Sequence, residues 1–150
     1  MFSQTITLFN RREGERGDEW IPTVIKNVMV NLDRASIIAK YGAQSNDNAT
    51  VHIPYKRSRN DIMISDKLWV PPKQWERMDG YIEAVTFTPG DRFDFFWVGE
   101  WTENVPIYDV DYAMEGDFYT YMNRKHDHVF VITSVSGPYS LIPHFEIFGK

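Results

Sequence analysis

The sequence contains no cysteine, which excludes disulfide bonds, thiolate metal sites and a thiol nucleophile. No apolar run approaches the roughly 18 residues that a membrane span needs. Residues 1–5 have neither the basic nor the apolar part of a secretory signal. Phosphate-binding glycine loops and serine nucleophile elbows are absent as well. We therefore expect neither a membrane protein nor an enzyme.

Positive charge is also in short supply. The chain has 16 Lys and Arg against 21 Asp and Glu, a net charge of −5, which argues against nucleic-acid binding through a basic surface. The charge is uneven: residues 1–75 hold 11 basic and 8 acidic residues, and residues 76–150 hold 5 and 13. Such asymmetry indicates association with other molecules and says little about the fold.

Aromatic side chains are abundant: 10 Phe, 8 Tyr and 5 Trp make up 15% of the 150 residues. With 43% apolar residues, the composition and length are those of one globular domain over residues 1–150. The aromatics of residues 87–101 could stack on single-stranded nucleic acid, but such platforms work with a basic groove and these neighbours are acidic. We expect them to fill the core, with some, including Trp101, at a subunit interface.

Alternation of polar and apolar residues predicts about eight short strands. They are expected at residues 5–9, 20–32, 50–55, 61–64, 82–88, 93–98, 128–134 and 144–148. Helices and strands do not alternate, which argues against a parallel sheet. The sequence therefore predicts a mainly β fold, a small antiparallel β-barrel or sandwich with two or three short helical insertions.

The insertions are expected at residues 33–48, 69–78 and 99–125. In the first, Asp33 is a candidate helix cap and Gly42 a candidate stop. In the second, Pro71 and Pro72 suit the start of a short helix. In the third, residues 99–117 hold six acidic and no basic residues, and helical spacing begins at Phe118. Residues 10–18 are polar with two glycines and predict a hairpin tip, and residues 89–91 predict a tight turn.

Two sets of residues could carry chemistry. His126 and His128 lie at positions i and i+2, and His144 from the last strand could complete a metal site. This spacing is a weak signal, and surface histidines are the preferred interpretation. The carboxylates of residues 100–117 could supply an acid–base pair, but an acidic loop facing water is commoner. We expect no catalytic residue, resident metal, cofactor or small-molecule substrate.

Three segments resemble the small stopper-type head–tail joining proteins of tailed bacteriophages. These segments are residues 5–28, with their strand, polar hairpin and Trp20, the Pro-Gly-Asp turn within residues 87–93, and the last two strands at 129–135 and 144–147. The whole chain also resembles an uncharacterised prophage family of about this length, through residues 119–125 and 142–147. The three insertions depart from a minimal stopper.

The resemblance implies a non-enzymatic β-barrel that forms a ring in the phage neck and contacts portal, adaptor and tail proteins. It also implies assembly in the host bacterial cytoplasm and a final place in the virion. We expect the ring contact to join the cationic hairpin of residues 10–18 to the acidic segment of residues 99–117. The candidate interface residues are Arg11, Arg12, Arg16, Glu100, Trp101, Glu103, Asp109 and Asp111.

Two alternatives remain open at this point. The protein could be a soluble phage-encoded inhibitor that binds a host enzyme, although a net charge of −5 is weak for a nucleic-acid mimic. It could instead be a metal-dependent enzyme that uses His126, His128 and His144. Metal content would separate the enzyme from the other two hypotheses, and the flanking genes would separate the neck protein from the inhibitor.

Overall fold

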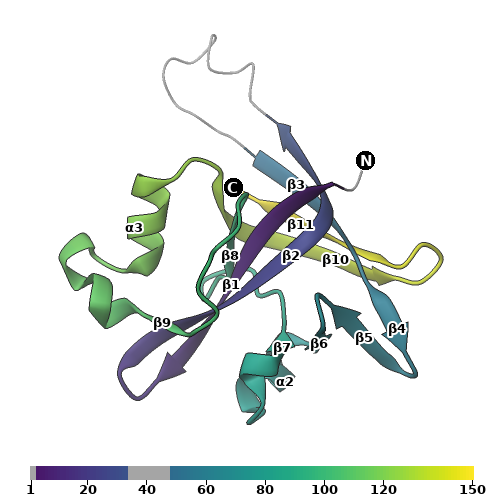
Figure 1. Ribbon diagram of the computed structural model, residues 1–150, viewed down its shortest axis with the longest axis horizontal. Helices are drawn as coiled ribbons and strands as arrows, with labels where there is room; N and C mark the ends of the chain where they lie inside the picture. Colours follow the sequence, from purple (N-terminus) through teal and green to yellow (C-terminus); the bar gives the residue numbers. More distant parts are fainter. Residues whose placement is uncertain (1–2, 34–47) are drawn as a thin grey trace.

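A computed structural model describes residues 3–33 and 48–150, and in these ranges the chain is mainly β (Figure 1). Eleven strands form one seven-stranded and one four-stranded sheet in the described ranges. The predicted fold class, a small β-barrel or sandwich with short helices, is therefore confirmed. The helix predicted after Asp33 lies outside the described residues.

Strands β1 (Gln4–Gly14) and β2 (Gly17–Asp33) form one long hairpin, whose pairing continues to Gly14 opposite Gly17. Gly17 has a φ of 91°, a left-handed conformation that suits glycine in this tight turn. The hairpin tip predicted at residues 10–18 is confirmed, although the turn is shorter than this polar stretch, since most of its residues are strand. Cross-strand contacts such as the Arg11–Asp18 ion pair (2.7 Å) stabilise the paired strands in this polar part of the hairpin.

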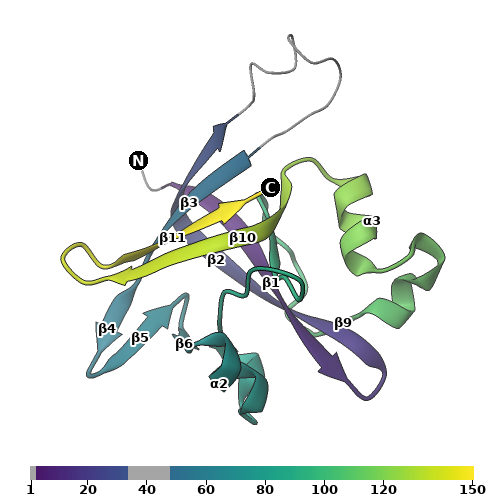
Figure 2. The same ribbon diagram turned by 180° about the vertical axis from the view of Figure 1, so that it is seen from behind.

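The larger sheet has the order β1-β8-β10-β11-β3-β2-β9, and β1 also pairs with β2. The pairings therefore return to β1, and every pair in this sheet is antiparallel. Its further strands are β3 (Asn48–Pro54), β8 (Phe95–Trp97), β9 (Ile107–Tyr108), β10 (Val129–Tyr139) and β11 (His144–Gly149). The β10–β11 hairpin projects from the body of the molecule (Figure 2).

The smaller sheet follows β3 directly along the chain. Its strands are β4 (Lys56–Ser58), β5 (Asp61–Ile64), β6 (Lys67–Trp69) and β7 (Ala84–Val85). Only the β6–β7 pair is parallel, because the chain passes through a helix between the two strands. The strand expected at residues 82–88 is shorter in the structure, where only Ala84 and Val85 form β7. The preceding residues, Tyr81–Glu83, form a 3₁₀ turn, η1.

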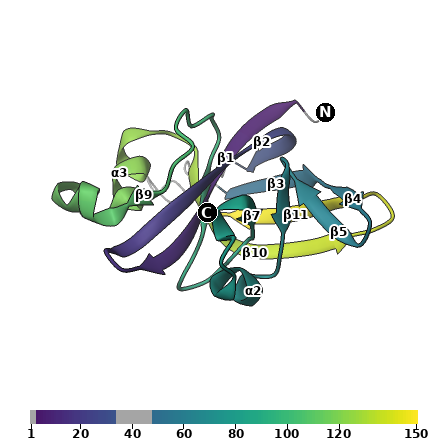
Figure 3. The ribbon, with the colours of Figure 1, turned by 60° about the horizontal axis from the view of Figure 1, so that its bottom comes forward.

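Short helices occur within the second and third predicted insertions. Helix α2 (Pro72–Arg77) starts on the expected proline, and α3 (Phe118–Lys125) starts after Asp117, whose carboxylate accepts a 2.7 Å hydrogen bond from the Thr120 N–H. The 3₁₀ segment η2 (Asp109–Glu115) precedes α3. None of the described helices has the length and apolar character to cross a bilayer. Figure 3 shows α2 and α3 on different sides of the strands.

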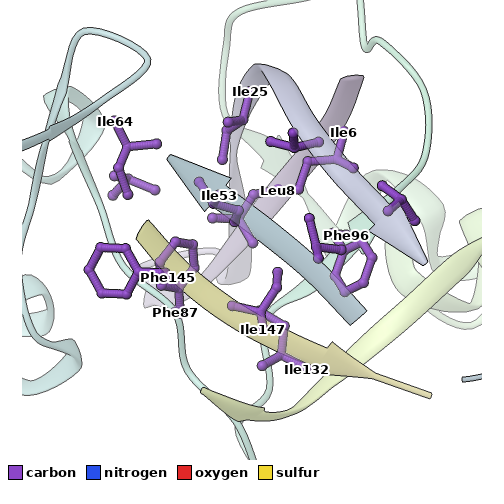
Figure 4. Packing of buried hydrophobic residues seen from close by; sticks show 14 of the residues in the cluster. Ile6, Leu8, Ile25, Ile53, Ile64, Phe87, Phe96, Ile132, Phe145 and Ile147 are labelled. Atoms are coloured by element: carbon purple, nitrogen blue, oxygen red, sulfur yellow. The ribbon is translucent and has the colours of Figure 1, made fainter. Parts of the chain in front are cut away.

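The main core lies between the strands of the larger sheet and the start of the smaller one (Figure 4). Alternation decides its membership, because on β3 and β11 every second side chain is buried. Its fully buried side chains include Ile6, Leu8, Val51, Ile53, Phe96, Ile132, Phe145 and Ile147. The core-filling role expected for the aromatics of residues 87–101 is thus confirmed for Phe87 and Phe96.

A second, aromatic core attaches the 99–125 region to the sheet. Phe118 of α3 packs edge-on against Phe9 with 5.2 Å between ring centroids, and Phe9 in turn stacks on Phe95 at 4.8 Å. Trp20, Ile107 and Met122 complete the buried cluster. A third cluster forms around Trp75 of α2. These contacts make the 99–125 insertion part of the packed molecule.

Candidate functional site

The hairpin arginines predicted to meet another subunit have contacts within their own chain. Arg11 pairs with Asp18, and its guanidinium lies 5.4 Å from the centre of the Trp20 ring. Arg12 lies 3.7 Å from the centre of the Tyr81 ring and donates a 3.0 Å hydrogen bond to the Trp75 carbonyl. Both side chains are half-buried, so they help to fix the hairpin on α2 and on the aromatic core.

Arg16, at the hairpin turn, lies 3.9 Å from Asp111 of the same chain. Both side chains are more than 60% exposed, so this contact is worth little and leaves each charge available to a partner. Asp109 has a different place: its Oδ1 accepts hydrogen bonds from Trp20 Nε1 (2.7 Å) and from the Phe118 N–H (3.1 Å). Asp109 therefore joins β2 to the start of α3.

The remaining interface candidates lie along the segment between β8 and β9. Glu100 and Glu103 are exposed, and Glu100 is 3.9 Å from Lys26. Trp101 is half-buried, with its ring 5.6 Å from those of Phe9 and Phe118. The acidic segment thus presents carboxylates outward while Trp101 anchors it. Whether any of these residues contacts a second subunit stays a prediction.

The most exposed of the large apolar side chains lie at two places that sequence patterns did not identify. Leu141 (96% exposed) and Ile142 (72%) form the tip of the β10–β11 hairpin, and Met114 (101%) lies on η2. These residues are not part of an alternating or helical pattern of apolar residues, so the sequence does not show whether they are buried or exposed. Exposed apolar groups on projecting elements are typical of contact surfaces.

A third feature is a cluster of two histidines and a glutamate on the outward face of β3 and β11. The register places Glu146 directly opposite His52, and His144 is two residues before Glu146 on the same face. His52 Nδ1 is 3.3 Å and His144 Nε2 is 3.7 Å from Glu146 Oε1. The three side chains are each between 21 and 26% exposed.

The alternative metal site of His126, His128 and His144 does not form, because the structure separates these three histidines. His126 and His128 precede β10, whose first residues lie beside the end of β11, whereas His144 pairs with Tyr139 at the far end of the same hairpin. Eleven strand positions separate the two places, about 30 Å or more. The pairing of β3 with β11 instead brings His52, which was not among those three histidines, close to His144 and Glu146. Alternation around Val51 and Ile53 marks it as outward-facing, and only strand pairing brings it to His144.

The described residues thus form a mainly β protein with projecting hairpins and a half-buried histidine–carboxylate cluster on one sheet face. Residues 1–150 match a protein family described as a family of unknown function (DUF6751), and the chain belongs to that family. No curated protein and no solved structure matches the chain.

Proposed function

We propose that this protein is a structural component of a bacteriophage or prophage neck, a stopper-like or connector subunit that associates with copies of itself in a ring. Its other partners would be portal-side and tail-side proteins, and it would perform no reaction. The observation that supports this best is the apolar tip of the β10–β11 hairpin, where the side chains of Leu141 and Ile142 are exposed. When a neighbouring surface covers two adjacent exposed aliphatic side chains, their removal from water stabilises the contact.

The distribution of charge supports a head-to-tail contact between copies. Exposed cations, Lys56, Arg57 and Arg59, gather on the β4–β5 hairpin. The acidic segment η2, with Asp111 and Glu115, lies at the other end of the molecule's longest axis (Figure 1). A contact between these two ends uses different surfaces on each copy, and contacts of that kind close into rings when the rotation between copies permits. Opposite charges on the two surfaces would orient the approaching subunits.

The test is the mass of the assembly in solution. Light scattering or sedimentation of the protein, alone and with its portal-side partner from the same gene cluster, should detect a ring, and negative-stain images should show it. Arg59→Glu and Asp111→Arg should each weaken assembly, and the two together should restore it. Persistent monomer with no partner binding, or failure of rescue across several such pairs, would overturn the proposal. Stable capture of a host enzyme in its place would favour the inhibitor hypothesis.

A further inference from the structure

We propose that His52, His144 and Glu146 form a binding site for a divalent transition-metal ion, a property separate from the proposed neck function. The potential ligand atoms of the three side chains all lie within 4.8 Å of one another. Nitrogen and oxygen ligands bind zinc at about 2.0–2.2 Å, so two ligands on one tetrahedral ion are about 3.3 Å apart. The separation of 3.3 Å between His52 Nδ1 and Glu146 Oε1 already has this value.

The surroundings of His144 hold its ring in the orientation that a metal ligand needs. Its Nδ1 is 2.6 Å from the carbonyl oxygen of Ile142, and because a carbonyl only accepts, this nitrogen carries the proton. The neutral ring then has its lone pair on Nε2, the atom that faces Glu146. A hydrogen bond from the other ring nitrogen to a backbone carbonyl is the usual support of a metal-binding histidine. Tyr139 stacks on the ring at 4.8 Å and restricts it further.

The backbone also holds the three groups in place. His52 lies in the middle of β3, and Glu146 and His144 lie on β11, so the ladder between two paired strands sets their spacing. On the opposite face of the same strands, Val51, Ile53, Phe145 and Ile147 are fully buried in the main core. Side chains on strands that are fixed by a packed core need little rearrangement to bind an ion, which favours affinity.

The ligand set indicates which metals fit. Two imidazoles and one carboxylate suit Zn²⁺, Co²⁺, Ni²⁺ or Cu²⁺, whereas Ca²⁺ and Mg²⁺ require mostly oxygen ligands. Three protein ligands leave at least one position for water or for a side chain of another molecule. A bound ion would connect β3 to β11 through His52 and His144, which are 92 positions apart in the sequence.

The competing interpretation is a plain ion pair, in which Glu146 interacts with protonated histidines and no metal binds. Titration calorimetry with Zn²⁺ on the full chain, purified without a histidine tag, separates the two. We expect one Zn²⁺ per chain. His52→Ala, His144→Ala and Glu146→Gln should each weaken binding at least about tenfold, because each removes a ligand. The control is the double variant His126→Gln with His128→Gln. It lacks two of the four histidines but should bind zinc like the natural chain.

A measurement on the unmodified chain guards against variants that fail to fold. Proton–nitrogen NMR spectra of the histidine rings, recorded with and without Zn²⁺, report which ring nitrogens bind the metal. We expect large nitrogen shifts for His52 and His144 and none for His126 and His128. Absence of saturable one-to-one binding overturns the proposal. So does binding that the His52 and His144 variants retain, or zinc-dependent shifts confined to His126 and His128.

Discussion

The side-chain amide of Asn10 donates a 2.8 Å hydrogen bond to the carboxylate of Asp94, 84 positions away in the sequence, and both residues are buried. The same amide donates to the Thr86 carbonyl at 2.7 Å. Asp94 also accepts from the N–H groups of Arg11 (2.8 Å) and Thr88 (2.9 Å). This carboxylate therefore joins β1 to the turn that precedes β8. Burial outweighs the three hydrogen bonds and raises the pKa of Asp94 to about 7.

Replacing Asp94 by Asn should destabilise the protein by about 2–3 kcal/mol. Each carboxylate oxygen faces at least one N–H donor, so either placement of the amide nitrogen sets a donor against a donor. Urea denaturation followed by tryptophan fluorescence measures the loss. Asp91→Asn, on the exposed part of the same turn, is the control and should change stability by less than about 0.5 kcal/mol. Equal stability of the two variants would contradict the role assigned to Asp94.

The raised pKa of Asp94 predicts a pH dependence of stability. The unfolded chain releases this proton near pH 4 and the folded protein near pH 7, so the folded state binds more protons between these values. The contribution of Asp94 to the free energy of unfolding is fully present below about pH 4. It decreases as the pH rises and is lost above pH 7, a change of up to about 4 kcal/mol.

Comparison with Asp94→Asn isolates this contribution from other titrating groups. The deficit of the variant relative to the natural chain should be largest at acidic pH, should shrink between about pH 4 and 7, and should level off above pH 7. Denaturant melts at half-unit intervals from pH 4.5 to 8.5 provide the measurement. A deficit that is constant over this range would show that Asp94 does not titrate there.

Asp109→Ala should destabilise the protein by about 2 kcal/mol, because it leaves the Trp20 indole N–H buried without its acceptor and removes a bond to the first N–H of α3. Thermal melts followed by circular dichroism measure this change. Asp111→Ala is the matched control two residues away, with a side chain 61% exposed, and should melt like the natural chain. If both variants melted alike, the bridging role of Asp109 would be wrong.

Phe118→Ala should cost about 3–5 kcal/mol, because the ring is fully buried between α3 and the sheet. The loss should appear first as local opening of residues 109–125, which hydrogen exchange detects. Tyr121→Ala on the same helix, with a half-buried ring, serves for comparison and should have a smaller effect. Unchanged exchange in both variants would mean that the aromatic core does not anchor this region.

The apolar hairpin tip leads to a prediction about association. Leu141→Ser combined with Ile142→Ser should leave thermal stability nearly unchanged, since both side chains are exposed, while it weakens binding to neighbouring subunits at least tenfold. Light scattering over a dilution series measures the effect. Ile82→Ser, 41% exposed and far from the hairpin in sequence, is the control. Assembly that survives the double change would remove the tip from the interface.

Local chemistry determined much of the fold. The alternation of residues 50–55 places Val51 and Ile53 in the core, and the helical spacing from Phe118 marks α3 at the predicted position. Pro71 and Pro72 likewise mark α2. These features depend on neighbours within a few positions, which a single sequence displays. The hairpin tip was predicted within residues 10–18, but not how far its strands extend, because their pairing depends on partners such as Trp20 and on Asp94, far along the chain.

Which strands pair was decided only in three dimensions. His52 and Glu146 each lie on an outward strand face that alternation reveals, yet nothing within either strand specifies that β3 aligns with β11 in this register. Shape-matched packing of Ile53 and Phe145 in the common core selects that alignment, and a shift by one residue would expose the apolar face of the strand. Residue spacing therefore determined which side chains face outward, and the packed core decided which of them meet.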